Sequence, residues 1–166
     1  MSIALRTRTH ACNLPMSELK RPRAETTERT DTPPRGPRTT SATTTRGICI
    51  EVRSEFLSER SSPRDGSYLF QYDVRISNVG SETAQLISRE WIITNADGEV
   101  ERVKGPGVIG EQPVLPPGSS FEYTSYCPLK TAVGSMHGSY QMVTANGDRF
   151  DAAISPFTLA VPNALN

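Results

Sequence analysis

From residue 48 onward, apolar and polar residues alternate along the chain with a period of two, which is the pattern of a β-strand with one buried face. The clearest run covers residues 68–77, where aromatic or branched aliphatic residues occupy every even position. Similar runs predict strands at residues 48–53, 84–94, 99–104, 121–125, 140–145, 150–154 and 157–161. Because no segment shows a convincing helical period, the pattern predicts an all-β domain of seven to eight strands, built as a sandwich or a barrel.

Two dipeptides between successive runs, Asp97-Gly98 and Asn146-Gly147, are typical of tight hairpin turns. In the run at residues 84–94, we expect Ile87, Trp91 and Ile93 to share one face. Trp91 is the only tryptophan, and its large apolar ring predicts an anchor packed between two sheets.

The first 46 residues differ in character from the rest. Residues 17–46 are rich in Thr, Arg, Pro and Glu and contain almost nothing to bury. Such a stretch cannot offset the ~1–2 kcal/mol per residue that backbone ordering costs, so we expect it to stay disordered. The sequence therefore predicts a disordered basic N-terminal extension, residues 1–46, and a folded domain, residues 47–166.

Charge is distributed unevenly between these two parts. Residues 1–46 hold nine Lys or Arg against four Asp or Glu, a net charge of +5, and residues 47–166 hold nine against fourteen, a net charge of −5. An acidic domain is a poor binder of phosphate backbones, because that affinity comes mainly from Lys and Arg. We therefore expect no nucleic-acid partner, except for weak binding through the basic extension.

The cysteines and the N-terminus favour a cytoplasmic protein. Cys12, Cys49 and Cys127 are an odd number without close spacing, which argues against a disulfide scaffold and fits a reducing compartment. No run reaches the ~18 apolar residues that a membrane span needs. Residues 1–15 carry charge but no apolar core of a secretory signal, and Met16 could equally be the first residue.

Gly105, Gly107 and Gly110 match the G-x-G-x-x-G pattern of dinucleotide-binding loops. In that fold the glycines lead from a strand into a helix that holds the pyrophosphate. Here residues 111–117 contain three prolines, which cannot propagate a helix, so a dinucleotide-binding fold is excluded. Two alternatives stay open. The glycines make a tight crossover between two sheets, or their N–H groups form a nest for an anion, with charge added by Lys104.

Several segments of the domain match one known family. They are SREW at residues 88–91, GPGVIGEQP at 105–113, PG at 117–118, YTS at 123–125 and GSMHGSY at 134–140. In these segments the sequence closely resembles the ApaG domain family, and the resemblance extends over about residues 48–159. Two positions depart from the family pattern: Tyr126-Cys127 stands where a glycine is common, and Ser155-Pro156 stands where a double proline is common.

The resemblance implies an immunoglobulin-like or fibronectin-type-III-like β-sandwich and no known enzymatic activity. Bacterial stand-alone members of the family are associated with cobalt resistance and magnesium efflux. Members that form part of larger chains look like protein-interaction modules.

Candidate groups for metal binding or catalysis are sparse. His137 is the only histidine in the domain, and with Cys127 it supplies at most two soft ligands, fewer than a zinc site needs. Glu99 and Glu101 share a strand face, but paired acids on an exposed strand are usually solvated. No serine has the G-x-S-x-G context of a hydrolase nucleophile. We therefore expect no enzyme, no cofactor and no metal site.

Two functional hypotheses follow. The first is a non-enzymatic module that binds an unknown protein partner through the glycine loop and the exposed edge of one sheet. The second is a sensor of a small phosphate-containing anion or nucleotide. The candidate binding residues are Lys104, Gly105, Gly107, Gly110, Tyr123 and Tyr126. The first hypothesis also predicts that Gly107→Glu abolishes partner binding without unfolding the domain.

Overall fold

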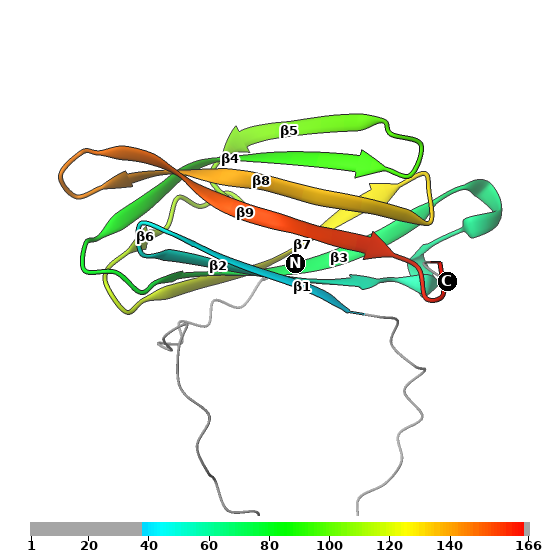
Figure 1. The fold of residues 1–166 in the computed structure, drawn as a ribbon, viewed down its shortest axis with the longest axis horizontal. Helices are drawn as coiled ribbons and strands as arrows, with labels where there is room; N and C mark the ends of the chain where they lie inside the picture. The colour runs from blue at the N-terminus through cyan, green and yellow to red at the C-terminus, as the bar shows by residue number, and fades with distance from the viewer. Residues whose placement is uncertain (1–37, 165–166) are drawn as a thin grey trace, which may run out of the picture.

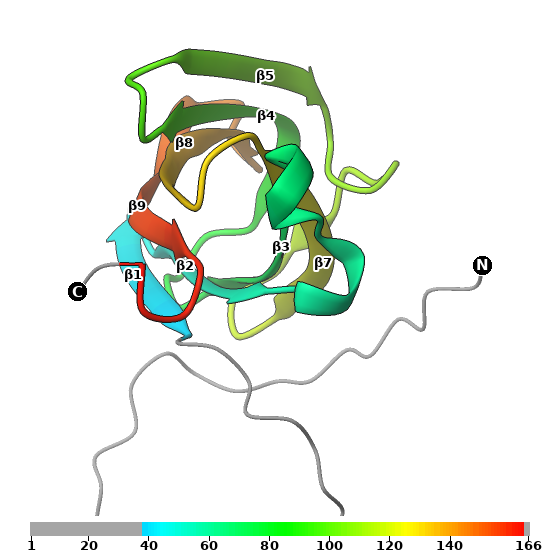
Figure 2. The same cartoon turned by 90° about the vertical axis from the view of Figure 1, so that its right-hand side faces the viewer.

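The structure, a computed structural model, describes residues 38–164 as two antiparallel sheets packed face to face (Figures 1 and 2). In the first sheet the strands lie in the order β1 (Thr39–Thr45), β2 (Ile48–Phe56), β3 (Tyr68–Asn78) and β7 (Ser120–Leu129). In the second sheet the order is β5 (Val100–Pro106), β4 (Ala84–Asn95), β8 (Val133–Thr144) and β9 (Arg149–Ala160), and β6 (Val114–Leu115) pairs with β4. Two short 3₁₀ turns, Ser58–Arg60 and Pro63–Asp65, connect β2 to β3.

The predicted all-β sandwich is confirmed, with some differences in the strands. The runs predicted at residues 150–154 and 157–161 form one strand, β9. Strand β8 begins at Val133 instead of residue 140. The sequence pattern missed its first half because that half is rich in small residues and shows no clear alternation of apolar and polar positions. Its neighbours β4 and β9 pair with it on both sides and hold it extended.

The boundary predicted at residue 47 is too late, because residues 39–45 form β1 inside the segment that we expected to be disordered. The strand has the sequence TTSATTT and pairs along its whole length with β2. Its inward hydroxyls also contact β9: Thr39 Oγ1 donates to the carbonyl of Thr158, and the hydroxyls of Thr43 and Ser155 hydrogen-bond. Hydrogen bonds from hydroxyl groups therefore hold β1 in place, although the segment has no apolar side chains that alternate along it. Residues 1–37 of the predicted extension lie outside the described residues.

Trp91 lies at the centre of the core, as predicted. Its side chain is 2% exposed and meets the rings of Tyr72, Tyr140 and Phe157 edge-on, with centroid distances of 5.4, 6.2 and 6.0 Å. The prediction that Ile87 shares this face is wrong.

An irregularity between Leu86 and Ser88 shifts the register of β4, so Leu86 is fully buried and Ile87 is not. A β-bulge of this kind reverses the inside and outside positions along a strand.

The two cysteines of the described part differ from each other. Cys127 is free and buried. Cys49 is disulfide-bonded, which differs from the expectation of reduced cysteines.

Candidate interaction surface

The two sheets leave strands β5 and β7 as edges on the same side of the sandwich (Figure 2). On the opposite side, β1 and β9 lie against each other through the hydroxyl contacts described above. Within residues 38–164, β5 pairs only with β4, and β7 pairs only with β3. Each edge therefore carries backbone N–H and C=O groups that no described strand satisfies.

The hydrogen-bond pattern identifies the outward residues of β7. At the end of β3, the N–H of Asn78 donates to Ser119 O on the β7 side at 2.9 Å, and the N–H of the next residue, Val79, donates to Gly47 O on the β2 side at 2.8 Å. The direction in which backbone N–H and C=O groups point alternates along an antiparallel strand. With the β3–β7 register, the N–H groups of the odd-numbered residues of β7 therefore point toward β3. The N–H groups of Glu122, Thr124 and Tyr126 therefore point away from the sheet.

Two prolines agree with this assignment, since a proline in a sheet is tolerated where its missing N–H would face solvent. Pro128 occupies an even position of β7. On β5, Gly107 donates its N–H to Ile87 O at 2.8 Å, which places odd residues against β4 and even residues outward, and Pro106 is one of these even residues. The outward N–H groups of β5 are those of Val100, Arg102 and Lys104.

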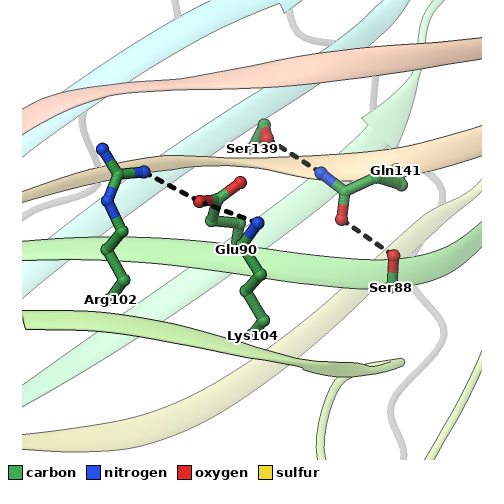
Figure 3. Close-up of polar contacts among 6 residues, drawn as sticks. All are labelled: Ser88, Glu90, Arg102, Lys104, Ser139 and Gln141. Carbon is green, nitrogen blue, oxygen red and sulfur yellow. Dashed lines mark hydrogen bonds and ion pairs between the residues drawn. The ribbon is translucent and has the colours of Figure 1, made fainter.

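The two edges differ in charge. On β5, Arg102 and Lys104 lie on the outer face with their cationic groups 3.0 and 3.5 Å from the carboxylate of Glu90 (Figure 3). Beside them, Gln141 accepts a hydrogen bond from Ser88 and donates one to Ser139 (Figure 3). Charged side chains on an edge strand discourage pairing with another strand, so β5 is a protected edge.

Strand β7 has no Lys or Arg among its ten residues. Its outward side chains include Tyr126, which is 47% exposed and has the guanidinium of Arg60 5.2 Å from its ring centre. Thr124 Oγ1 donates to Asp73 Oδ1 at 2.6 Å. These side chains line an open depression on the outer face of the first sheet. Of the two edges, β7 carries less charge: Glu122 is its only charged residue, and it is ion-paired with Arg75 at 3.4 Å.

The glycine loop uses its backbone groups internally. Gly107 N–H is bonded to Ile87 O, and Val108 and Glu111 exchange N–H to O bonds of 2.8 and 2.9 Å. Arg89 Nη1 donates to the carbonyls of Pro106 and Gly107 at 3.0 and 2.7 Å. The loop therefore presents carbonyl groups to a cation, and the reading of the loop as an anion nest is not favoured. It leads into β6 and not into a helix, as the prolines predicted.

The glycines themselves have structural roles. Gly107 has a φ of +56°, and a Cβ there would lie 2.1 Å from Glu111 O. Gly105 packs against the guanidinium of Arg89, which would lie 3.2 Å from an added Cβ. Gly110 has a φ of +79° with open space around it. Because any side chain at residue 107 displaces backbone, Gly107→Glu disrupts the loop itself and cannot separate binding from folding.

Two predicted binding residues lie away from the loop. Tyr123 is 6% exposed and its hydroxyl is 2.5 Å from that of Tyr140, so it belongs to the core and the prediction that it lies on the surface is wrong. Lys104 points to the outer face, toward Glu90. Sequence alternation alone could have indicated that Tyr123 is buried, because it lies two residues from Phe121 on the same face of β7. Arg89 was missed, since nothing local marks it as the partner of the loop carbonyls.

The buried phenols make the stability of the domain sensitive to high pH. Burial raises the pKa of Tyr72, Tyr123 and Tyr140 above the usual 10.0. The unfolded chain therefore releases these protons first, so stability is intact below about pH 10 and falls as the pH rises above it.

We expect the denaturation midpoint to drop above pH 10, with the phenolate absorbance of these three tyrosines appearing together with unfolding. Tyr123→Phe should weaken this pH dependence. Ionisation of all five tyrosines in a chain that keeps its native circular dichroism would contradict the expectation.

Metal ligands are not brought together in the part of the chain that the structure describes. Residues 38–164 contain no group of three His, Cys, Asp or Glu side chains placed to hold an ion. Glu99 instead accepts a hydrogen bond from Asn95 Nδ2 at 2.7 Å. None of the described helical segments is long and apolar enough to cross a membrane.

Comparison with known proteins gives a consistent result. The model of the ApaG domain family matches residues 58–144. Protein ApaG of Anaeromyxobacter dehalogenans is 56% identical over 126 residues, covering 76% of this chain and 99% of that protein. Protein ApaG of Thiobacillus denitrificans is 54% identical over 119 residues, covering 72% and 94%. A crystal structure of a protein assigned as ApaA from Bordetella pertussis superposes with a TM-score of 0.69 at 47% identity, covering 70% of this chain and 95% of that one.

Proposed function

The chain belongs to the ApaG domain family, and we propose that it is a non-enzymatic interaction module that pairs the β7 edge with an extended segment of a partner protein. The observation that carries the proposal is the set of outward N–H and C=O groups at Glu122, Thr124 and Tyr126, on an edge without Lys or Arg. In strand addition, backbone hydrogen bonds supply affinity and alternate side chains supply specificity. A small-anion sensor is the less favoured alternative, because the loop N–H groups at residues 107 and 108 are already bonded.

The outward side chains favour a particular kind of segment. A strand beside β7 would place every second side chain next to Thr124 and Tyr126, over the open depression of the first sheet. β-branched and aromatic side chains fit such cross-strand positions best. The Glu122 carboxylate is already ion-paired, with Arg75 Nε at 3.4 Å, so the partner segment needs no basic side chain at that end.

Cobalt resistance and magnesium efflux, which the family resemblance implies, enter this proposal only through the partner. The domain would regulate or assemble a partner that handles the cation and would not bind the cation itself. The support is chemical. Glu99, one of the acidic residues considered as a cation ligand, accepts a hydrogen bond from Asn95, and within residues 38–164 it does not belong to any group of three candidate ligands.

Thr124→Pro tests the edge directly. It removes one outward N–H at a position equivalent to that of Pro128, so the fold is expected to persist. Thr124→Val is the matched control, because it also removes the hydroxyl but keeps the N–H. In a bacterial strain that lacks its own ApaG, we expect Thr124→Val to restore growth on cobalt and Thr124→Pro to fail. Full restoration by a folded Thr124→Pro chain, or stoichiometric Co²⁺ binding to the wild-type protein in calorimetry, would overturn the proposal.

A further inference from the structure

The tip of the loop between β5 and β6 is a tight turn with an unusual occupant. The reciprocal hydrogen bonds between Val108 and Glu111 enclose Ile109 and Gly110, which have φ angles of +44° and +79°. A two-residue hairpin turn with positive φ at both central positions is most stable as Asn-Gly. A β-branched residue such as Ile is a genuine outlier there, because its side chain crowds the backbone in the left-handed region.

The base of the loop imposes this conformation. Val108 is fully buried in the core, and Gly107 leaves no room for a Cβ. Arg89 holds two carbonyls of the loop, and Gln112 Nε2 donates to Ile87 O at 2.8 Å. The residues that flank the turn are therefore held in place by several contacts. The turn projects from the side of the sandwich that carries β5 and β7 (Figure 2).

The side chain at this strained position is also exposed. Ile109 is 38% exposed, and it is one of five large hydrophobic residues in residues 38–164 that reach such exposure. Ile109 is therefore only partly buried by its own domain. An Asn at this position would relieve the strain and keep the turn. Backbone strain that the surrounding structure maintains clusters at functional positions such as active sites, ligand clamps and switch regions.

We propose that Ile109 is an anchor residue that inserts into an apolar pocket on the partner protein. This inference rests on the proposed function and adds a second contact on the same side of the molecule as β7. A rigid turn presents the Ile109 side chain in one fixed position, and such preorganisation lowers the entropic cost of binding. A few contacts usually carry most of the affinity of an interface.

A folded protein fits this anchor better than a lipid surface does. The exposed neighbour of the turn is Glu111, and residues 38–164 hold eleven Lys or Arg against fourteen Asp or Glu, a net charge of −3. Anionic lipid attracts basic segments, so this surface lacks the charge that would assist membrane binding.

Site-specific photo-crosslinking in cells that express the full chain locates the partner. The photoreactive residue replaces Ile109, Tyr126 or Val79, where Val79 is an exposed control outside both sites. We expect positions 109 and 126 to capture the same protein and position 79 to capture none. Capture from 126 but not from 109 would refute the anchor and leave the edge-pairing function standing. Capture from neither position would refute both.

Variants then measure the anchor against the identified partner. Ile109→Asn is expected to raise the melting temperature by roughly 2–6 °C, because it relieves the strained turn, and to weaken binding at least tenfold. Ile109→Val, which keeps a branched apolar side chain, should bind within about threefold of wild type. Unchanged affinity for Ile109→Asn would overturn the inference. So would sedimentation of the wild-type chain, but not of Ile109→Asn, with vesicles of phosphatidylcholine and phosphatidylglycerol.

Discussion

A chain that begins at residue 47 will be less stable to unfolding than one that begins at residue 38, by about 2–4 kcal/mol. The shorter chain lacks β1, so seven residue pairs with β2 and the hydroxyl contacts with β9 are lost together. Loss of β1 also turns β2 into an unpaired edge, which favours aggregation. Urea denaturation of the two chains, followed by circular dichroism, measures the difference.

A point variant separates the role of β1 from chain length. In the chain that begins at residue 38, Ser41→Pro places a proline at the centre of β1, where its ring and missing N–H disturb the strand. Thr40→Pro is the comparison variant, because the N–H groups of adjacent strand residues point in opposite directions. Only one of the two prolines therefore removes an N–H that faces β2, and that variant should be the more damaging. Equal denaturation midpoints for chains that start at residues 38 and 47 would show that β1 contributes nothing.

Gly138→Ala will destabilise the domain by about 3 kcal/mol or more. Gly138 pairs with Trp91 across β4 and β8, and a Cβ at this glycine would lie 2.0 Å from Glu90 O and 3.2 Å from Trp91 Cα. The neighbouring atoms are backbone, so relief requires the two central strands to separate and the Trp91 cluster to repack. A glycine inside a strand marks such a close approach.

Ser139→Ala is the matched control for this variant. It lies one residue further along β8 on the outer face, where it only accepts a hydrogen bond from Gln141. We expect a loss of about 1 kcal/mol or less there, because one partly buried hydrogen bond between side chains contributes little net stability. Similar melting temperatures for the two variants would mean that β8 and β4 can move apart without cost, contrary to the close approach of their backbones at Gly138.

The fold was largely readable from the sequence because most strands bury one face. The alternation at residues 68–77 predicted β3, and Trp91 was correctly expected in the core. Strand β1 was not predictable by the same reasoning, because threonine hydroxyls and not apolar side chains hold it against β9. The bulge at Leu86 likewise carries no local signal, so the face of Ile87 was assigned wrongly.

The candidate site was less predictable than the fold. The glycine pattern correctly marked an unusual loop, but its hydrogen-bond partners Ile87 and Arg89 lie on another strand, 17 or more residues earlier. Tyr126 was correctly placed on the surface, whereas Tyr123 was not. The free edge of β7 depends on strand order, which the local alternation of a single strand does not contain.

Amide hydrogen exchange along β7, measured residue by residue by NMR on the full chain, tests the availability of this edge most directly. We expect alternation. The amides of Phe121 and Tyr123, which face β3, are protected, whereas those of Glu122, Thr124 and Tyr126 exchange rapidly in the free protein and become protected when the partner binds. Uniform protection of both sets in the free protein would contradict it, because the edge proposed to receive a partner strand would already be covered.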